Sequence, residues 1–193
     1  VIVWMPSYLN RFYHMPTDRA GAVAAIIVLC SGAGMVLCGI LSDRLCRQRP
    51  DRKISLAIAY CLGSCLLLSI AFALPFGTPQ LVLICLGMLI AAGTSGPAGA
   101  MVANLTHYKV HGTAFATLTL ANNLLGLAPG PFITGRVSDI IGLDAAFQLV
   151  PLISIGSAAV FFYAKRHYHN DMAALKSTSV DETAVEALTE VQP

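Results

Sequence analysis

Five long apolar runs, separated by short polar connections, restrict the fold of this chain more than any other feature. The runs cover about residues 22–42, 54–74, 80–104, 113–135 and 145–164. A helix needs about 20 apolar residues to cross the hydrocarbon core of a bilayer, and each run approaches or exceeds that length. A soluble helix of this length would carry a polar stripe, and these runs show little of one. The sequence therefore predicts an all-α membrane protein with five spanning helices.

A sixth helix is predicted at the N-terminus, where the chain begins inside an apolar stretch with no helix start signal. Residues 1–11 lack the basic segment and the cleavage site of a signal peptide. We therefore interpret them as a truncated first helix, and the chain as a fragment of a longer protein. The six predicted helices cover about residues 1–11, 17–42, 54–74, 80–104, 113–138 and 145–164.

The charged residues lie mainly in the connections and in the C-terminal segment. All three glutamates follow residue 180, and the acids before residue 170 fall in or next to breaks between apolar runs. This distribution predicts one helical bundle over residues 1–169, followed by a polar, acidic tail over residues 170–193.

Lys and Arg predict the orientation in the membrane. Alternate connections lie on the same side, and nine of the twelve Lys and Arg residues fall on the side that holds connection 43–53 and the tail. Positive residues are retained in the cytoplasm. The sequence therefore predicts that connection 43–53 and the C-terminus are cytoplasmic, with the basic residues as a topology anchor.

Two of the apolar runs contain helix-breaking residues. In run 80–104, small residues recur every fourth position, and Gly96-Pro97 interrupts the span. Such a face permits close helix packing, and a proline bends a helix. This pattern fits a tightly packed, kinked helix, and it also fits a bending helix beside a water-accessible cavity.

The run near residue 130 is interrupted more strongly, because Pro129, Gly130, Pro131 and Gly135 follow one another closely. Asn122 and Asn123 precede Pro129 by two turns or fewer, and amides are costly in hydrocarbon without partners. They either form interhelical hydrogen bonds or line a substrate path. In contrast, runs 54–74 and 145–164 are plainly apolar, and we expect them to face lipid.

The polar residues form no catalytic or metal-binding pattern. The six cysteines show no CxxC spacing, and His107 and His111 adjoin a loop and Gly112. The P-loop sequence GxxxxGK[ST] is absent. The sequence thus predicts no enzyme activity, no catalytic residue, no metal, no cofactor and no nucleic-acid partner.

The connection after the second helix resembles a known signature. Residues 39–47, GILSDRLCR, resemble the GxLxDRxGRR pattern of the major facilitator superfamily, with Cys46 where the pattern has glycine. WMPSYLNRF at 4–12 and GPFITGRVSDIIG at 130–142 resemble the seventh and eleventh helices of that family. The chain resembles the C-terminal six-helix half of such a transporter, with features of the spinster-like or anion:cation symporter branches.

The resemblance implies roles for particular residues. It implies that Gly39, Asp43, Arg44 and Arg47 gate the cytoplasmic side, although Asp43 also fits simple helix capping. It implies that the first and fourth helices line a central cavity and that the second and fifth meet the other half. The candidate cavity residues are Tyr8, Arg11, Thr94, Ser95 and Asn104, with Asn122 and Asn123 near the interface. Arg11 either pairs with an anionic substrate or marks the outer membrane boundary.

The same resemblance implies a function. It points to a secondary active transporter that moves a small organic solute by alternating access, with proton coupling. The implied partners are the solute, the lipid bilayer and a missing N-terminal six-helix half, and the implied location is a bacterial inner membrane. The alternative is a related membrane sensor or scaffold that transports nothing.

Overall fold

The computed structural model describes residues 1–46 and 51–168, so Arg47 and the predicted tail at 170–193 lie outside the described residues. The described part is helical, and it contains no strand. Its elements are, in chain order, η1 (Ile2–Trp4), α1 (Met5–Phe12), α2 (Thr17–Leu45), α3 (Asp51–Ala73), α4 (Thr78–Ala92), α5 (Ser95–Leu105), η2 (Tyr108–Val110), α6 (His111–Asn122), the π-helix η3 (Asn123–Leu127), α7 (Pro129–Ile141), α8 (Leu143–Leu149) and η4 (Val150–Leu152). Helix then continues over residues 153–168, which we call the last helix.

Four helical segments of the described chain are long and apolar enough to cross a membrane. They are Thr17–Leu45, Arg52–Ala73, Thr78–Leu105 and Leu143–Tyr168. The fifth predicted span, at 113–135, is divided among α6, η3 and α7. Two prolines explain why this span is divided, because Pro129 and Pro131 have no backbone N–H to donate in a regular helix.

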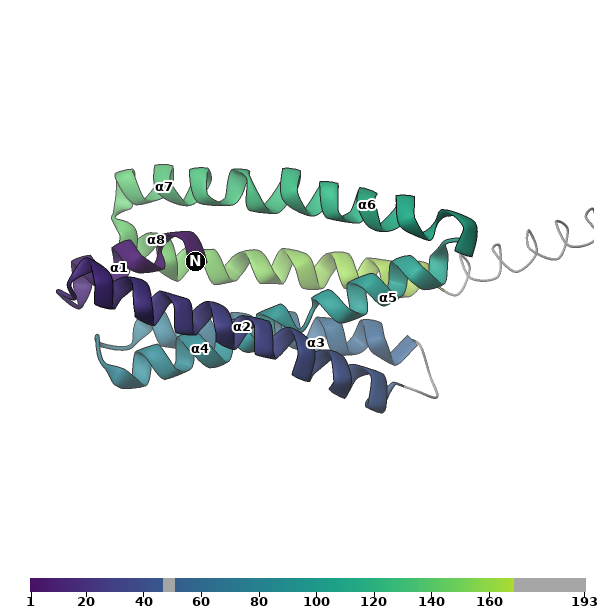
Figure 1. Cartoon of the computed structure of the whole chain (residues 1–193), viewed down its shortest axis with the longest axis horizontal. Helices are drawn as coiled ribbons and strands as arrows, with labels where there is room; N and C mark the ends of the chain where they lie inside the picture. Colours follow the sequence, from purple (N-terminus) through teal and green to yellow (C-terminus); the bar gives the residue numbers. More distant parts are fainter. Residues whose placement is uncertain (47–50, 169–193) are drawn as a thin grey trace, which may run out of the picture.

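The helices form a bundle with a dense side and an open side (Figure 1). Helices α2, α3 and α4 pack together on one side, and α6 and α7 run along the opposite edge. The last helix lies between these two groups in this view. No residue of α6, η3 or α7 is buried, whereas α2 and α4 each bury several.

Glycines allow the dense side to form. A Cβ atom on Gly34 of α2 would lie 2.2 Å from the carbonyl oxygen of Leu89 on α4. A Cβ on Gly87 of α4 would lie 2.7 Å from the Leu68 side chain on α3. Close backbone approach of this kind is what small residues provide between membrane helices.

Helix α3 is the most buried of the four candidate spans, and the prediction that 54–74 faces lipid stays a prediction. In α3, 44% of the most apolar window is buried, compared with 22% in each of the other three candidate spans. The reason is position, because α3 packs against α4 and also against α5, α8 and η4. An evenly apolar helix suits a protein interior as well as a lipid environment, so composition alone could not distinguish the two.

The core lies where the ends of α1, α3 and α8 meet. Tyr8 of α1 packs on Phe147 of α8 with ring centroids 5.0 Å apart, and Phe72 of α3 lies 5.1 Å from Phe147. Phe12 and Phe76 extend this aromatic cluster toward the connections. This end corresponds to the side that the charge distribution predicts to be extracytoplasmic.

Replacing Gly34 should test the contact between α2 and α4. We expect Gly34→Ala to lower the stability of the purified protein by about 1–3 kcal/mol, because the new methyl meets a backbone carbonyl that cannot move aside. Gly32→Ala is the matched control, since a Cβ there meets nothing within 4 Å. Thermal unfolding in detergent measures both, and equal midpoints for the two variants would contradict the packing described here.

Candidate functional site: polar contacts at the ends of the bundle

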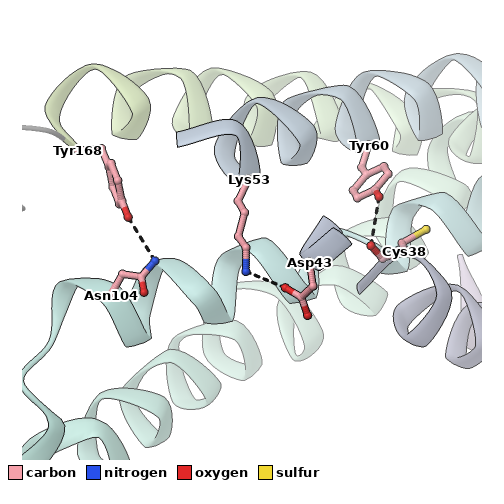
Figure 2. A network of polar contacts seen from close by, with 6 residues as sticks. All are labelled: Cys38, Asp43, Lys53, Tyr60, Asn104 and Tyr168. Atoms are coloured by element: carbon pink, nitrogen blue, oxygen red, sulfur yellow. Dashed lines mark hydrogen bonds and ion pairs between the residues drawn. The ribbon is translucent and has the colours of Figure 1, made fainter. Parts of the chain in front are cut away.

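The motif that resembles the family signature lies where α2 ends and α3 begins. Lys53 of α3 donates to Asp43 Oδ1 of α2 across 2.7 Å (Figure 2). The Asp43 side chain is 73% exposed and that of Lys53 is 22% exposed. An exposed ion pair contributes little stability, so this pair can open at small energetic cost. Asp43 was among the predicted gating residues, whereas its partner Lys53 was not.

The other motif residues have different surroundings. The Cα of Gly39 lies 3.5 Å from the position of a Cβ on Gly96, which brings the backbones of α2 and α5 close together. Arg44 is exposed in the last turn of α2. Arg47 lies outside the described residues. The structure thus places Gly39 and Asp43 at contacts with two different helices.

A buried contact supports the junction of α2 and α3. Tyr60 of α3 donates to the carbonyl oxygen of Cys38 on α2 across 3.2 Å (Figure 2). Ser42, one turn later, is 2% exposed and its hydroxyl has no hydrogen-bond partner. A serine inside a helix can donate to the carbonyl four residues earlier. Here that carbonyl belongs to Cys38 and already accepts from Tyr60.

Asn104 joins α5 to the last helix at the same end of the bundle. Its side-chain nitrogen donates to the Tyr168 hydroxyl across 3.2 Å (Figure 2). Tyr168 is buried, and Asn104 is exposed. Asn104, which was predicted to line the cavity, therefore makes an interhelical hydrogen bond. Its partner Tyr168 was not among the predicted site residues.

The opposite end holds a buried polar cluster around Gln80. Gln80 is fully buried, and its amide donates to the Tyr8 hydroxyl across 3.1 Å. The Tyr13 hydroxyl donates to Gln80 Oε1 and accepts the Gly77 N–H. Burial raises the pKa of Tyr13, which lies in the connection after α1, so its hydroxyl stays protonated and remains a donor. No sequence pattern singles out Gln80, because a single amide near a helix start is ordinary.

Two predicted cavity residues near this end differ in exposure. Tyr8 is fully buried within the aromatic cluster, whereas Arg11, one turn later, is exposed. Thr94 and Ser95 lie farther along the bundle, at the break between α4 and α5, where the Thr94 hydroxyl donates to the Ala91 carbonyl across 2.9 Å. No hydrogen bond joins any two of the predicted cavity residues in the part of the chain that the structure describes.

The broken segment between α6 and α7 is attached to the N-terminus by Trp4. The Trp4 indole donates to the Pro131 carbonyl across 3.0 Å. A Cβ on Gly135 would lie 3.0 Å from the Trp4 ring, so Gly135 lets the ring pack on α7. Neither contact was predicted, because the partners are more than 120 residues apart.

A cavity of about 560 Å³ adjoins this break. Its lining includes Trp4, Leu125, Leu127 and residues 129–131. The carbonyls of Leu125 and Leu127 lack regular α-helical donors, because residues four positions later are prolines. Asn122 and Asn123 precede the break on the exposed surface. This arrangement supplies acceptor groups, and residues 1–46 and 51–168 contain no group of three or more His, Cys, Asp or Glu that could hold a metal ion.

The comparisons with known proteins give the family. The chain matches the Major Facilitator Superfamily over residues 1–188, and it belongs to that family. The predicted family is therefore confirmed, together with a fold of membrane-spanning helices. The choice between the two predicted branches stays a prediction.

Two curated relatives are similar over most of this chain. The glucose-6-phosphate exchanger SLC37A1 of Homo sapiens is 21% identical over 187 residues, which cover 94% of this chain and 34% of the relative. The sphingosine-1-phosphate transporter SPNS2 of Danio rerio is 26% identical over 173 residues, which cover 81% of this chain and 34% of the relative. The chain thus spans about a third of the length of these relatives. No solved structure matches it.

Tyr8 should contribute to stability through its hydroxyl. We expect Tyr8→Phe to destabilise the purified protein by about 1–3 kcal/mol, because it leaves the buried Gln80 amide without this acceptor. Tyr163→Phe is a suitable control, since Tyr163 is 67% exposed. Thermal unfolding of both variants decides the matter, and an unchanged midpoint for Tyr8→Phe would show that the contact contributes nothing.

Proposed function

We propose that this chain forms the C-terminal half of a secondary active transporter that moves a small organic solute by alternating access with proton coupling. Membership of the Major Facilitator Superfamily over residues 1–188 carries the proposal. The four apolar spans and the transporters among its relatives support it. Proton coupling and alternating access rest on the family resemblance.

The names of the two relatives suggest the first solutes to test. Glucose 6-phosphate and sphingosine 1-phosphate are both organic molecules that carry a phosphate group. We propose this class for the first assays, with the exposed Arg11 as the candidate cation for a solute phosphate. Tyr8, Thr94, Ser95, Asn104, Asn122 and Asn123 stay candidate cavity residues.

An N-terminal six-helix half is part of the proposal. Large apolar side chains of the helices expected to meet that half are exposed here, among them Leu29, Val36, Leu120, Leu124 and Leu125. The charge distribution supports a cytoplasmic C-terminus. The bacterial inner membrane stays a prediction from the sequence.

Transport by the complete protein in proteoliposomes is the primary test. We expect uptake of radiolabelled glucose 6-phosphate or sphingosine 1-phosphate above that of empty vesicles, with further accumulation under an imposed pH gradient. A protonophore should abolish the accumulation while leaving exchange across the membrane. Uptake that is indifferent to the pH gradient would refute proton coupling. If the protein took up neither phosphate ester and no solute from a wider organic panel, the result would support the alternative of a membrane sensor or scaffold.

Asp43 should be needed for the transport cycle. We expect Asp43→Asn to lower the transport rate about threefold while membrane insertion stays normal, because the neutral amide loses the charge-assisted contact with Lys53. Transport rate and surface labelling of the inserted protein measure the two effects separately. Asp139→Asn, at the opposite end of the bundle, serves as the control.

Exchange of the two charges refines this test. The double variant Asp43→Lys with Lys53→Asp keeps an ion pair between α2 and α3, so we expect it to recover part of the lost rate. Wild-type transport by Asp43→Asn would exclude the proposed gating role and leave Asp43 as a helix-end or topology residue.

A further inference from the structure

An apolar groove runs between α5, α6 and the last helix, apart from the cavity beside Trp4. Its volume is about 630 Å³. Helices α5 and α6 each present one face to it at the regular spacing of a helix. The lining residues are Ala98, Met101, Val102, Leu105, Thr106, Ala114, Thr117, Leu118, Ala121 and Phe161.

The groove wall has no group that would bind a polar ligand. Its two hydroxyls are already used within their own helices. Thr106 donates to the Val102 carbonyl across 2.7 Å, and Thr117 donates to the Thr113 carbonyl across 2.9 Å. No charged side chain belongs to the lining. The chemistry of the wall therefore fits a hydrocarbon chain.

One end of the groove is basic. Phe161 lines the groove, and Tyr168 of the same helix bonds to Asn104 of α5 (Figure 2). Residues 161, 165 and 168 lie on one face of a helix. Lys165 therefore lies between these two contacts, on the face that meets α5, and it is exposed. Lys109 adds a second positive charge in η2, the short turn that follows α5 and precedes α6.

We propose that this groove binds one acyl chain of an anionic membrane phospholipid, with the lipid phosphate at Lys165. A slot with an apolar wall and a cation at one end complements an amphiphile that has a hydrocarbon chain and a negative head group. The surrounding bilayer supplies such a molecule. Assignment to the cytoplasmic leaflet rests on the orientation in the proposed function, whereas the binding itself does not depend on transport.

The two parts of the site should contribute in different ways. The groove binds the chain whatever its head group, because burial of apolar surface is not specific for charge. Lys165 supplies the preference for an anionic head group. A single Lys near an anionic lipid surface contributes about 1 kcal/mol, which corresponds to about a fivefold preference.

Native mass spectrometry of the purified complete protein tests the site. Dioleoylphosphatidylglycerol and dioleoylphosphatidylcholine, which have identical chains, are titrated in parallel. We expect the anionic lipid to bind the wild type about fivefold more tightly, Lys165→Gln to remove that preference, and Lys165→Arg to keep it. Leu118→Trp fills the groove and should weaken the binding of both lipids at least threefold.

Ile140→Trp is the matched control for bulk, because Ile140 is 83% exposed on α7 and does not line the groove. Arg136→Gln is the control for charge outside the groove. Equal binding of the two lipids to the wild type would overturn the head-group assignment. Unchanged binding to Leu118→Trp would overturn the groove itself, and it would favour coverage of this face by the other half of the protein. Neither outcome bears on the transport assay.

Discussion

The requirement that backbone N–H and C=O groups find partners where water is absent governs this structure. Regular helices satisfy the requirement within themselves, which explains why the apolar runs fold as they do. Two departures from regular helix are each accompanied by an added side-chain hydrogen bond. The Thr94 hydroxyl bonds to a backbone carbonyl at the α4–α5 break, and the Trp4 indole bonds to the Pro131 carbonyl beside the π-helix. The breaks are thus local and supported.

Packing divides the bundle into two regions with different properties. Gly34 and Gly87 allow the backbones of α2, α3 and α4 to approach closely, so these helices form a dense unit. The segment from α6 to α7 buries no residue, and it contacts α5, α8 and Trp4. A protein that changes shape needs one region that keeps its geometry and another with few contacts to break. The described part of this chain contains both.

The sequence predicted most of the fold because the length and hydropathy of each span are local properties. It also located Asp43, since that residue lies in a contiguous motif. It missed the partners that determine the site, Tyr60, Gln80 and Tyr168, because each meets a residue 22 to 72 positions away. The greater burial of α3 was not predicted for a different reason, since lipid and protein interior are equally apolar. Which side chains of different helices meet depends on how the helices pack, and local sequence does not encode this.

The π-helix has a further consequence for the segment that contains it. A turn closed by the bond from the Ala128 N–H to the Asn123 carbonyl holds one residue more than an ordinary α-helical turn. Each residue of an α-helix advances the phase by about 100°. The extra residue therefore rotates α7 relative to α6. As a result, α6 faces α5, whereas α7 turns Gly135 toward Trp4. Deleting a single residue here would remove this rotation and turn α7 toward a different neighbour.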